Sequence, residues 1–287
     1  MNSDELGQTL NKTFTGAIDA IWQRKALNRR LNMQLEHYWM AKRGNSGNPL
    51  VRSGAKYFSQ NDEDGIIIEI LRRIGLEEGV ALELGVGNGL ENNSLILLML
   101  GWRVLWIGND ELSFTLPDKC SNLRFSKKWI TKENCIEMLS ASLASIDAQG
   151  ANLISIDLDG NDIYILEALL EAGHRPEVYV VEYNGKFPPP VRWRIKYDSS
   201  YSWGASDYQG ASLQESIDVM RSAGYVLVCC NVTGANAFFV KSDRLNRFSD
   251  VPTDIQELFF PADYNWFYQR GHWTSPKTIE RFLKISE

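Results

Sequence analysis

The spacing of hydrophobic residues divides the chain into one long helix and a region in which strands and helices alternate. In residues 16–42 apolar side chains recur three to four positions apart among many Arg, Lys and Gln residues, which is the period of a helix. Short β-rich runs then alternate with helical segments. The predicted strands are 80–84, 103–107, 123–125, 152–157, 178–182, 225–231 and 237–240, and the predicted helices are 62–74, 91–100, 132–142, 161–172 and 212–223.

This alternation predicts a doubly wound α/β fold, with a mostly parallel seven-stranded sheet and helices on both faces. Only residues 232–236 separate the last two strands, which is too short for a helical crossover, so these strands should form an antiparallel hairpin. Ser59 to Asp62 resembles a capping box that starts a helix, and Gly75 is placed to end it. The pattern therefore predicts a Rossmann-like domain with an N-terminal helical extension.

Length and composition fit one large domain with additions at each end. The chain has 287 residues, of which 44% are hydrophobic and 23% charged, as expected for a globular protein with a sizeable core. We expect an N-terminal helical extension at 1–56, the main domain at 57–242 and a C-terminal extension at 243–287 that packs on it. The N-terminal helix should pack on the main domain or on a second subunit, which would make the protein a homo-oligomer.

Charge and targeting signals narrow the class of protein. The 30 basic and 36 acidic residues give a net charge of −6, which argues against a chain built to coat nucleic acid. The four cysteines show no CxxC spacing, so neither zinc nor a disulfide framework is indicated. The N-terminus does not resemble a secretory signal, and the longest aliphatic run, 95–100, is too short to cross a bilayer. We therefore expect a soluble cytoplasmic protein.

The strongest local motif is an acidic residue followed by three glycines, Glu83, Gly85, Gly87 and Gly89, directly after a predicted strand. Glycines at this position let a ligand approach the backbone at the carboxyl edge of the sheet. A dinucleotide-binding loop has the spacing G-x-G-x-x-G, whereas here Leu90 occupies the sixth place, and no phosphate-binding G-x-x-x-x-G-K-[ST] is present. The spacing disfavours both nicotinamide cofactors and nucleoside triphosphates.

Segments spread over most of residues 57–242 resemble the FkbM-type methyltransferases, a family of class I enzymes that use S-adenosylmethionine. The resemblance lies in 58–65, 83–94, 130–134, 155–162 and 181–184. It implies an O-methyltransferase that acts on a hydroxyl of a sugar or natural-product precursor. It also implies that the glycine loop lies against the amino-acid part of the cofactor, with Glu83 near its ammonium group and Gln60 and Asn93 among the cofactor contacts.

One feature of that family is absent at its usual place. An acidic residue normally ends the second strand and binds both ribose hydroxyls, but this sequence has Gly108 there. Asp110, two residues further on, is the first carboxylate that can accept hydrogen bonds from two neighbouring hydroxyls. We therefore assign the ribose contact to Asp110.

Oxygen-bearing side chains follow two further strands that should be neighbours in the sheet. Asp157 and Asp159 end one, and Glu182 and Asn184 end the next, so the four should meet at the ligand edge. We expect Glu182, with Asp159 or Asp157, to act on the acceptor hydroxyl, either as a base or through a divalent ion such as Mg²⁺ or Mn²⁺ held by all four. The alternative is that Asp159 and Asp162 cap the following helix and Glu182 contacts the cofactor or the acceptor directly.

Residues 185–210 leave regular structure and carry many aromatic and basic side chains, which is typical of a specificity loop. Trp193, Arg194 and Tyr197, with Asn184, are the predicted acceptor contacts, and they suit a sugar that bears an anionic group. Interleaved basic and aromatic residues also occur in proteins that bind single-stranded nucleic acid. An RNA-directed methyltransferase therefore stays open, as does an inactive methyltransferase fold that serves in binding or assembly.

Overall fold

The computed structural model describes residues 3–263 and 276–285, and it contains a single mixed sheet between two layers of helices. The strands are β1 (Val80–Leu84), β2 (Arg103–Gly108), β3 (Leu123–Lys127), β4 (Leu153–Ile156), β5 (Val178–Glu182), β6 (Tyr225–Cys230) and β7 (Asn236–Lys241). The helices are α1 (Ser3–Gly44), α2 (Pro49–Arg52), α3 (Glu63–Ile74), α4 (Leu95–Met99), α5 (Cys135–Ala144), α6 (Asp162–Glu171), α7 (Leu213–Ser222), η1 (Ser242–Phe248), α8 (Ile255–Leu258) and α9 (Pro276–Glu280).

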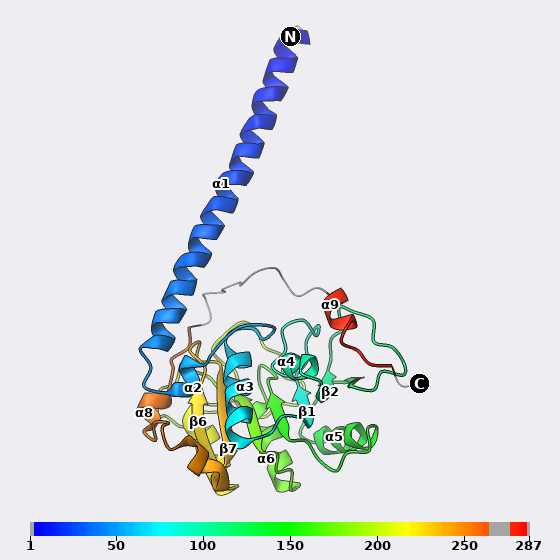
Figure 1. Ribbon diagram of the computed structural model, residues 1–287, viewed down its shortest axis with the longest axis vertical. Helices are drawn as coiled ribbons and strands as arrows, with labels where there is room; N and C mark the ends of the chain where they lie inside the picture. Colours follow the sequence, from blue (N-terminus) through cyan, green and yellow to red (C-terminus); the bar gives the residue numbers. More distant parts are fainter. Residues whose placement is uncertain (1–2, 264–275, 286–287) are drawn as a thin grey trace.

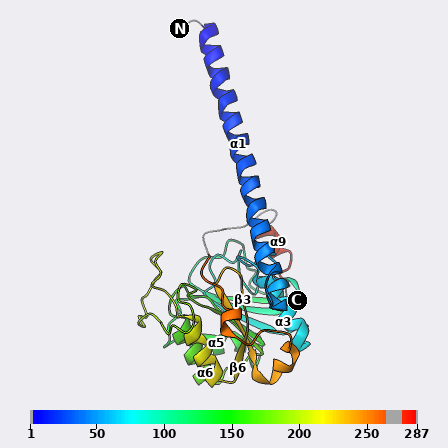
Figure 2. The ribbon, with the colours of Figure 1, turned by 90° about the vertical axis from the view of Figure 1, so that its left-hand side faces the viewer.

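The strand order is β3-β2-β1-β4-β5-β7-β6. Strands β1 to β5 pair in parallel, while β7 is antiparallel to both β5 and β6, so the predicted C-terminal hairpin is confirmed. Helices α5, α6 and α7 lie on one face of the sheet, and α2, α3 and α4 lie on the other (Figures 1 and 2). The predicted doubly wound architecture is correct, and it brings the carboxyl ends of β1, β2, β4 and β5 to one edge.

The core follows from strands that are apolar on both faces. All five residues of β1 and all four of β4 are buried, which is the pattern of parallel strands covered on both sides. Predicted element ends shift by a few residues: helix α4 begins at Leu95, later than the predicted 91, and α5 begins at Cys135. Gly75 ends α3 in a left-handed conformation with φ of 73°, as its position in the sequence predicts.

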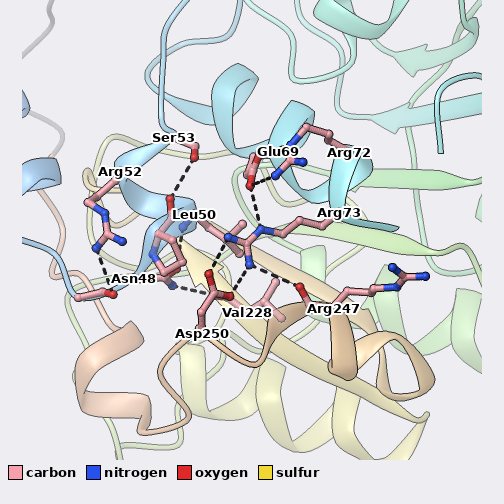
Figure 3. A network of polar contacts seen from close by, with 12 residues as sticks. Asn48, Leu50, Arg52, Ser53, Glu69, Arg72, Arg73, Val228, Arg247 and Asp250 are labelled. Carbon is pink, nitrogen blue, oxygen red and sulfur yellow. Dashed lines mark hydrogen bonds and ion pairs between the residues drawn. The ribbon is translucent and has the colours of Figure 1, made fainter. Parts of the chain in front are cut away.

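Polar contacts join the N-terminal segment to the rest of the domain (Figure 3). The Asn48 side chain accepts from the Leu50 amide at 2.9 Å and donates to the Val228 carbonyl of β6 at 2.8 Å, so it caps α2 and anchors it to the sheet. Nearby, Arg73 of α3 pairs with Glu69 and with Asp250, which follows η1. These contacts join α2 to strand β6 and α3 to the segment that follows η1.

Helix α1 has 42 residues and projects far beyond the domain (Figure 1). Ile21, Trp22 and Leu27 lie on its exposed part, whereas Trp39 in the penultimate turn is buried in the core, with the Lys42 amine 5.0 Å from its ring centroid. None of the described helices combines the length and apolar character that spanning a bilayer requires. Residues 264–275 of the predicted C-terminal extension lie outside the described residues; α9 and the residues after it contact the loop before β3.

We expect Trp39→Ala to lower the free energy of unfolding by about 3 kcal/mol, because it removes a large buried ring and leaves a cavity. Trp39 is 3% exposed and Trp22 is 63% exposed on the same helix, so Trp22→Ala is the matched control. Its effect should stay within ~0.5 kcal/mol. Urea unfolding of both variants measures the difference; equal losses would mean that α1 is not anchored through Trp39.

Candidate active site

The glycine loop after β1 is held by an unusually close approach of neighbouring strand ends. A Cβ atom on Gly85, whose φ is +93°, would lie 1.5 Å from the carbonyl oxygen of Asp157. A Cβ atom on Gly108 would lie 2.0 Å from the carbonyl oxygen of Val86. The amides of Gly85 and Val86 both donate to the Ile107 carbonyl, at 2.9 and 3.2 Å. Backbone contact alone therefore joins the ends of β1, β2 and β4.

This packing explains the missing carboxylate at the end of β2. A side chain at position 108 would collide with the glycine loop as this backbone places it, so Gly108 cannot be replaced by an acidic residue without a shift of the loop. Asp110 takes a place over the loop instead: a Cβ atom on Gly87 would have the Asp110 Oδ2 atom as its nearest neighbour, at 3.9 Å. Gly87 and Asp110 thus face the same open space, which agrees with the assignment of Asp110 to a ribose contact.

The first cavity at this edge has a volume of about 360 Å³ and is open to solvent. That volume lies within the usual range for small-molecule sites. The glycine loop forms its floor, Asp110 lies at one side, and Trp129 and Ile130, which follow β3, form a wall. Its lining residues are Gly85, Val86, Gly87, Gly108, Asn109, Asp110, Lys128, Trp129, Ile130, Asp157, Leu158, Asp159, Asn161, Tyr201, Ser202 and Trp203.

The second cavity has a volume of about 420 Å³ and is lined by acids and amides. It shares Gly85, Gly87, Asp157, Asp159 and Trp203 with the first cavity, so the two meet above the glycine loop. The lining contains no Lys or Arg. Its residues are Gln60, Asn61, Glu83, Gly85, Gly87, Asn88, Glu91, Asn92, Asn93, Asp157, Asp159, Glu182, Trp203, Gln209, Ala235 and Asn236.

Glu83 serves the fold as well as the cavity. Its carboxylate accepts hydrogen bonds from the amides of Asn93 at 3.0 Å and Ser94 at 2.9 Å, and from the Ser94 hydroxyl. Burial raises its pKa, and these hydrogen bonds oppose that rise. Glu83 therefore holds the turn before α4, which explains why the helix begins later than predicted. A Cβ atom on Gly89 would lie 2.9 Å from the side chains of Leu112 and Phe114, and Gly89 does not line either cavity.

Two acids at the start of α3 position the loop that carries Gln60 and Asn61. One Asp64 oxygen accepts from three successive amides, those of residues 57, 58 and 59, at 2.7, 2.6 and 2.9 Å. Glu63 accepts from the Asn61 amide at 2.8 Å and from the Asn236 side chain at 3.3 Å. The loop is thereby tied to the β6–β7 turn across the second cavity.

The capping box predicted at Ser59 to Asp62 is wrong in its details. Asp62 occupies the N-cap position of α3, but its side chain makes no capping hydrogen bond. The Ser59 hydroxyl accepts from the amide of Asp64 at 3.3 Å, five residues along the chain, whereas a capping box joins residues that are three apart. The physical reason is that the Asp64 carboxylate accepts from the amides of residues 57–59, which folds this loop back onto the start of α3.

Asp157, Asp159 and Glu182 come together as predicted. Each offers one carboxylate oxygen, and the three oxygens lie within 4.8 Å of one another. The amide of Asp159, a residue with φ of 54°, donates to Glu182 at 3.2 Å. Burial, followed by the charges of neighbouring acids, raises the pKa values of Asp157 and Glu182 well above their ordinary range. The cluster can accept a proton or bind a cation.

Asp162 and Asn184 have structural contacts beside this cluster. Asp162 accepts from the amides of Leu158 at 2.7 Å and Gly160 at 2.9 Å, which fixes the turn between β4 and α6. The Asn184 side chain donates to the carbonyls of Asp207 and Gln209 at 2.9 and 3.0 Å, and accepts from the Lys186 amide at 3.1 Å. These contacts leave Asn184 as the anchor of segment 185–210, and it lines neither cavity.

The predicted acceptor contacts within segment 185–210 lie away from both cavities. Trp193 stacks on Phe187 with ring centroids 4.3 Å apart, Arg194 pairs with Glu167 and Glu215, and the Tyr197 hydroxyl donates to Glu133 at 2.6 Å. Lys186 and Arg192 are also paired with acids. Three basic side chains of this segment, those of Lys186, Arg192 and Arg194, are therefore engaged in ion pairs within the protein.

Other residues of the same segment reach the cavities. Tyr201 lies against Gly160, where a Cβ atom would be 2.4 Å from its ring. Trp203, 48% exposed, lines both cavities, and Gln209 lines the second. Sequence reasoning found the segment but not these side chains. It also missed Trp129, Asn236 and Asn61. The only signals for them in the sequence were that Trp129 follows a predicted strand, that Asn236 lies in the link between the last two strands, and that Asn61 lies within the 58–65 segment.

A seven-stranded sheet in this order, closed by an antiparallel β7, is the fold of class I methyltransferases, and the two cavities lie at its ligand edge. No protein-family model matches the chain, and no curated protein matches it. Among solved structures it is similar to the MycE methyltransferase from the mycinamycin biosynthetic pathway in complex with Mg and SAH, at 15% identity and a TM-score of 0.35.

A second MycE structure, which also contains mycinamycin VI, gives 16% identity and a TM-score of 0.30. The chain covers 44% and 45% of the two MycE chains, with 61% of its own length in each case. A third structure concerns the conversion of a disulfide bond into a thioacetal group during echinomycin biosynthesis. It gives 15% identity and a TM-score of 0.30 over 72% of this chain and 92% of the other. The chain thus spans less than half the length of the MycE chains that it matches.

We expect Asp157→Asn to raise the melting temperature of the metal-free protein at about pH 8 and to have little effect near pH 4. Burial raises the pKa of Asp157, so the folded protein keeps a proton that the unfolded chain releases. The stability of the wild type therefore falls as pH rises above the ordinary carboxyl pKa, and the neutral side chain escapes this loss. Thermal unfolding in EDTA measures the difference; a lower melting temperature for the variant at the higher pH would contradict this account.

Proposed function

We propose that this protein is an S-adenosylmethionine-dependent methyltransferase that acts on a hydroxyl group of a small molecule, such as a sugar or a natural-product precursor. The observation that carries the proposal is the meeting of two cavities above the glycine loop, one suited to a nucleoside and the other lined by carboxylates and amides. A methyl donor in the first would present its reactive end at the boundary, beside Asp157, Asp159 and Glu182.

The first cavity offers the contacts that the adenosine half of the cofactor needs. Asp110 supplies a carboxylate for the ribose hydroxyls, and the side chains of Trp129 and Ile130 provide an apolar wall for the base. Gln60, Asn93 and Glu83 line the second cavity on the other side of the glycine loop, where the amino-acid half would lie. In this arrangement Glu83 contributes negative charge near the ammonium group while it also holds the turn before α4.

The second cavity suits a neutral acceptor with several hydroxyl groups. Its amide side chains both donate and accept hydrogen bonds, and the exposed ring of Trp203 offers an apolar face. No Lys or Arg is among the lining residues that the structure describes, so an anionic group on the acceptor would meet only amide donors there. Trp193, Arg194 and Tyr197 do not line this cavity, so we propose Trp203, Gln209 and Asn236 as the acceptor contacts in it.

The carboxylates would activate the acceptor. Methyl transfer requires the acceptor oxygen to lie in line with the methyl carbon and to lose its proton. Glu182, with its raised pKa, is positioned to take that proton, while Asp157 and Asp159 flank it.

The donor set of the cluster also fits a hard divalent cation, because carboxylate oxygens are the ligands that Mg²⁺ and Mn²⁺ prefer. Asp157, Asp159 and Glu182 would hold such an ion. When bound, it would lower the pKa of the acceptor hydroxyl and offset the mutual repulsion of the carboxylates. Asn184, predicted as a fourth ligand, is engaged by the backbone of segment 185–210.

We expect Gly87→Val to weaken binding of S-adenosylhomocysteine by at least about tenfold, or ~1.4 kcal/mol, in a folded protein. The added side chain has open space around it and would project into the first cavity toward Asp110. Gly150→Val, at another open glycine far along the chain, is the control. Isothermal titration calorimetry provides the measurement, and unchanged affinity in a folded Gly87→Val protein would refute the placement of the cofactor.

We expect Glu182→Gln to reduce methyl transfer by at least about a hundredfold while cofactor binding is kept. Glu91→Gln, another acid in the second cavity, is the control. If an ion is required, EDTA abolishes turnover and Mg²⁺ or Mn²⁺ restores it. If Glu182 acts alone, EDTA has no effect, and activity falls as pH falls through the raised pKa of Glu182. Wild-type turnover in Glu182→Gln would exclude both roles.

A further inference from the structure

A third cavity lies away from the sheet edge, between the last turns of α1 and the loops that precede α3 and follow β6. Its volume is about 140 Å³. Glu36, Trp39 and Arg43 of α1 line one side, and Asp62 and Val232 line the other. An engineered cavity of ~150 Å³ in another protein holds benzene, which has six heavy atoms. This cavity is also partly open to solvent, so a somewhat larger ligand can extend out of it.

Asp62 is buried in this cavity, and its carboxylate has no close hydrogen-bond donor among the residues that the structure describes. Its side chain is 1% exposed, and neither oxygen has a partner there. Of the next two acids, Glu63 accepts from the Asn61 amide, and one Asp64 oxygen accepts from loop amides while the other has no partner. An unsatisfied buried carboxylate is costly. Burial and the charge of Glu63 raise the pKa of Asp62 to about 7, while the charge of Arg43 and the nearby backbone amides of Asp62 and Val232 oppose that rise.

Two further charged groups of the cavity are also unpaired within the described part of the chain. Neither Arg43 nor Glu36 makes an ion pair there, although Arg43 lies near enough to Asp62 to influence its pKa. The adjacent Lys42 does not line the cavity, and it pairs with Asp263 at 3.2 Å and donates to the Val232 carbonyl at 2.7 Å. Lys56 also lines the cavity, but it pairs with Glu91 at 4.0 Å. Among the described residues, Asp62 on one wall and Arg43 on the other are thus an acid and a base without an ion pair.

We propose that this cavity binds a free α-amino acid with a small apolar side chain. Its ammonium group would donate to Asp62 and lie within the negative field of Glu36. Its carboxylate would meet the guanidinium of Arg43, which is suited to paired hydrogen bonds with a carboxylate. Its side chain would contact Trp39, Met40 and Val232, the apolar part of the lining.

Such a ligand would join α1 to the loop before α3, which carries Gln60 and Asn61 of the second cavity. Asn61 lines both this cavity and the second cavity of the candidate active site, and it directly precedes Asp62. Binding would therefore stabilise both the docked end of α1 and the loop before α3. The proposal does not depend on the reaction proposed above, because the cavity shares no carboxylate with the Asp157–Asp159–Glu182 cluster.

The first test uses L-leucine as the probe in calorimetry and thermal unfolding of the full chain. We expect L-leucine to bind and to raise the melting temperature in a concentration-dependent way. L-leucinol lacks the carboxylate and N-acetyl-L-leucine lacks the ammonium group, so each should bind at least about tenfold more weakly. Absence of L-leucine binding at millimolar concentration, or equal binding of either analogue, would overturn the proposal.

The second test separates a ligand-binding role of Asp62 from a structural one. Asp62→Asn and Arg43→Gln should each weaken L-leucine binding at least about tenfold, whereas Arg29→Gln, on the exposed part of α1, should not. Glu182→Gln should leave L-leucine affinity unchanged, since it alters only the candidate active site. The ligand-free Asp62→Asn protein should melt at the same or a higher temperature, because a buried unpaired charge is removed. A lower melting temperature with unchanged L-leucine affinity would show that Asp62 is structural.

Discussion

The close approach of the strand ends at Gly85 and Gly108 is the constraint on which the site depends. No side chain fits at either position, since Cβ atoms there would lie 1.5 and 2.0 Å from backbone oxygens of neighbouring segments. The absence of side chains lets the loop after β1 lie directly between β2 and β4. It therefore opens the first cavity, brings Asp157 beside the glycine loop, and displaces the expected carboxylate from position 108 to Asp110.

A second constraint is electrostatic. The ligand edge gathers Glu83, Asp157, Asp159 and Glu182, and no basic side chain of residues 3–263 or 276–285 lines the cavity that they share. Such a cluster destabilises the fold at neutral pH, because burial and repulsion disfavour its charged state. The surrounding sheet tolerates that cost, since strands β1 and β4 are buried throughout. Buried carboxylates with raised pKa values that cluster at one edge of a sheet are typical of catalytic and cation-binding sites.

The sequence predicted the sheet and the acidic cluster because both follow from regular rules. Strand periodicity and the short link at 232–236 determine the order of elements, and parallel strands bring Asp157 and Glu182 to one edge. The direction of side chains in segment 185–210 could not be predicted, because irregular backbone has no repeating pattern of side-chain directions. Trp193 and Arg194 were predicted as acceptor contacts from their residue types alone, whereas Trp203 and Gln209 are the residues of this segment that line the second cavity. The capping-box pattern failed because Asp64 binds three amides of its own loop.

The close backbone contact also explains why a departure from a motif can preserve a site. Gly108 breaks the pattern of the resembled family, yet the same glycine allows the packing that places Asp110 over the loop. The glycine at position 108 is therefore compatible with a carboxylate two residues further on that faces the same loop. The resemblance to FkbM-type enzymes stays a prediction, whereas the class I methyltransferase fold is defined by the strand order.

The most direct test of this account is a crystal structure of the protein with S-adenosylhomocysteine. We expect the adenine against Trp129, the ribose hydroxyls on Asp110, and the sulfur atom at the boundary of the two cavities, facing Glu182. Density for the ligand in another cavity, or bound with its sulfur turned away from the carboxylate cluster, would contradict the account.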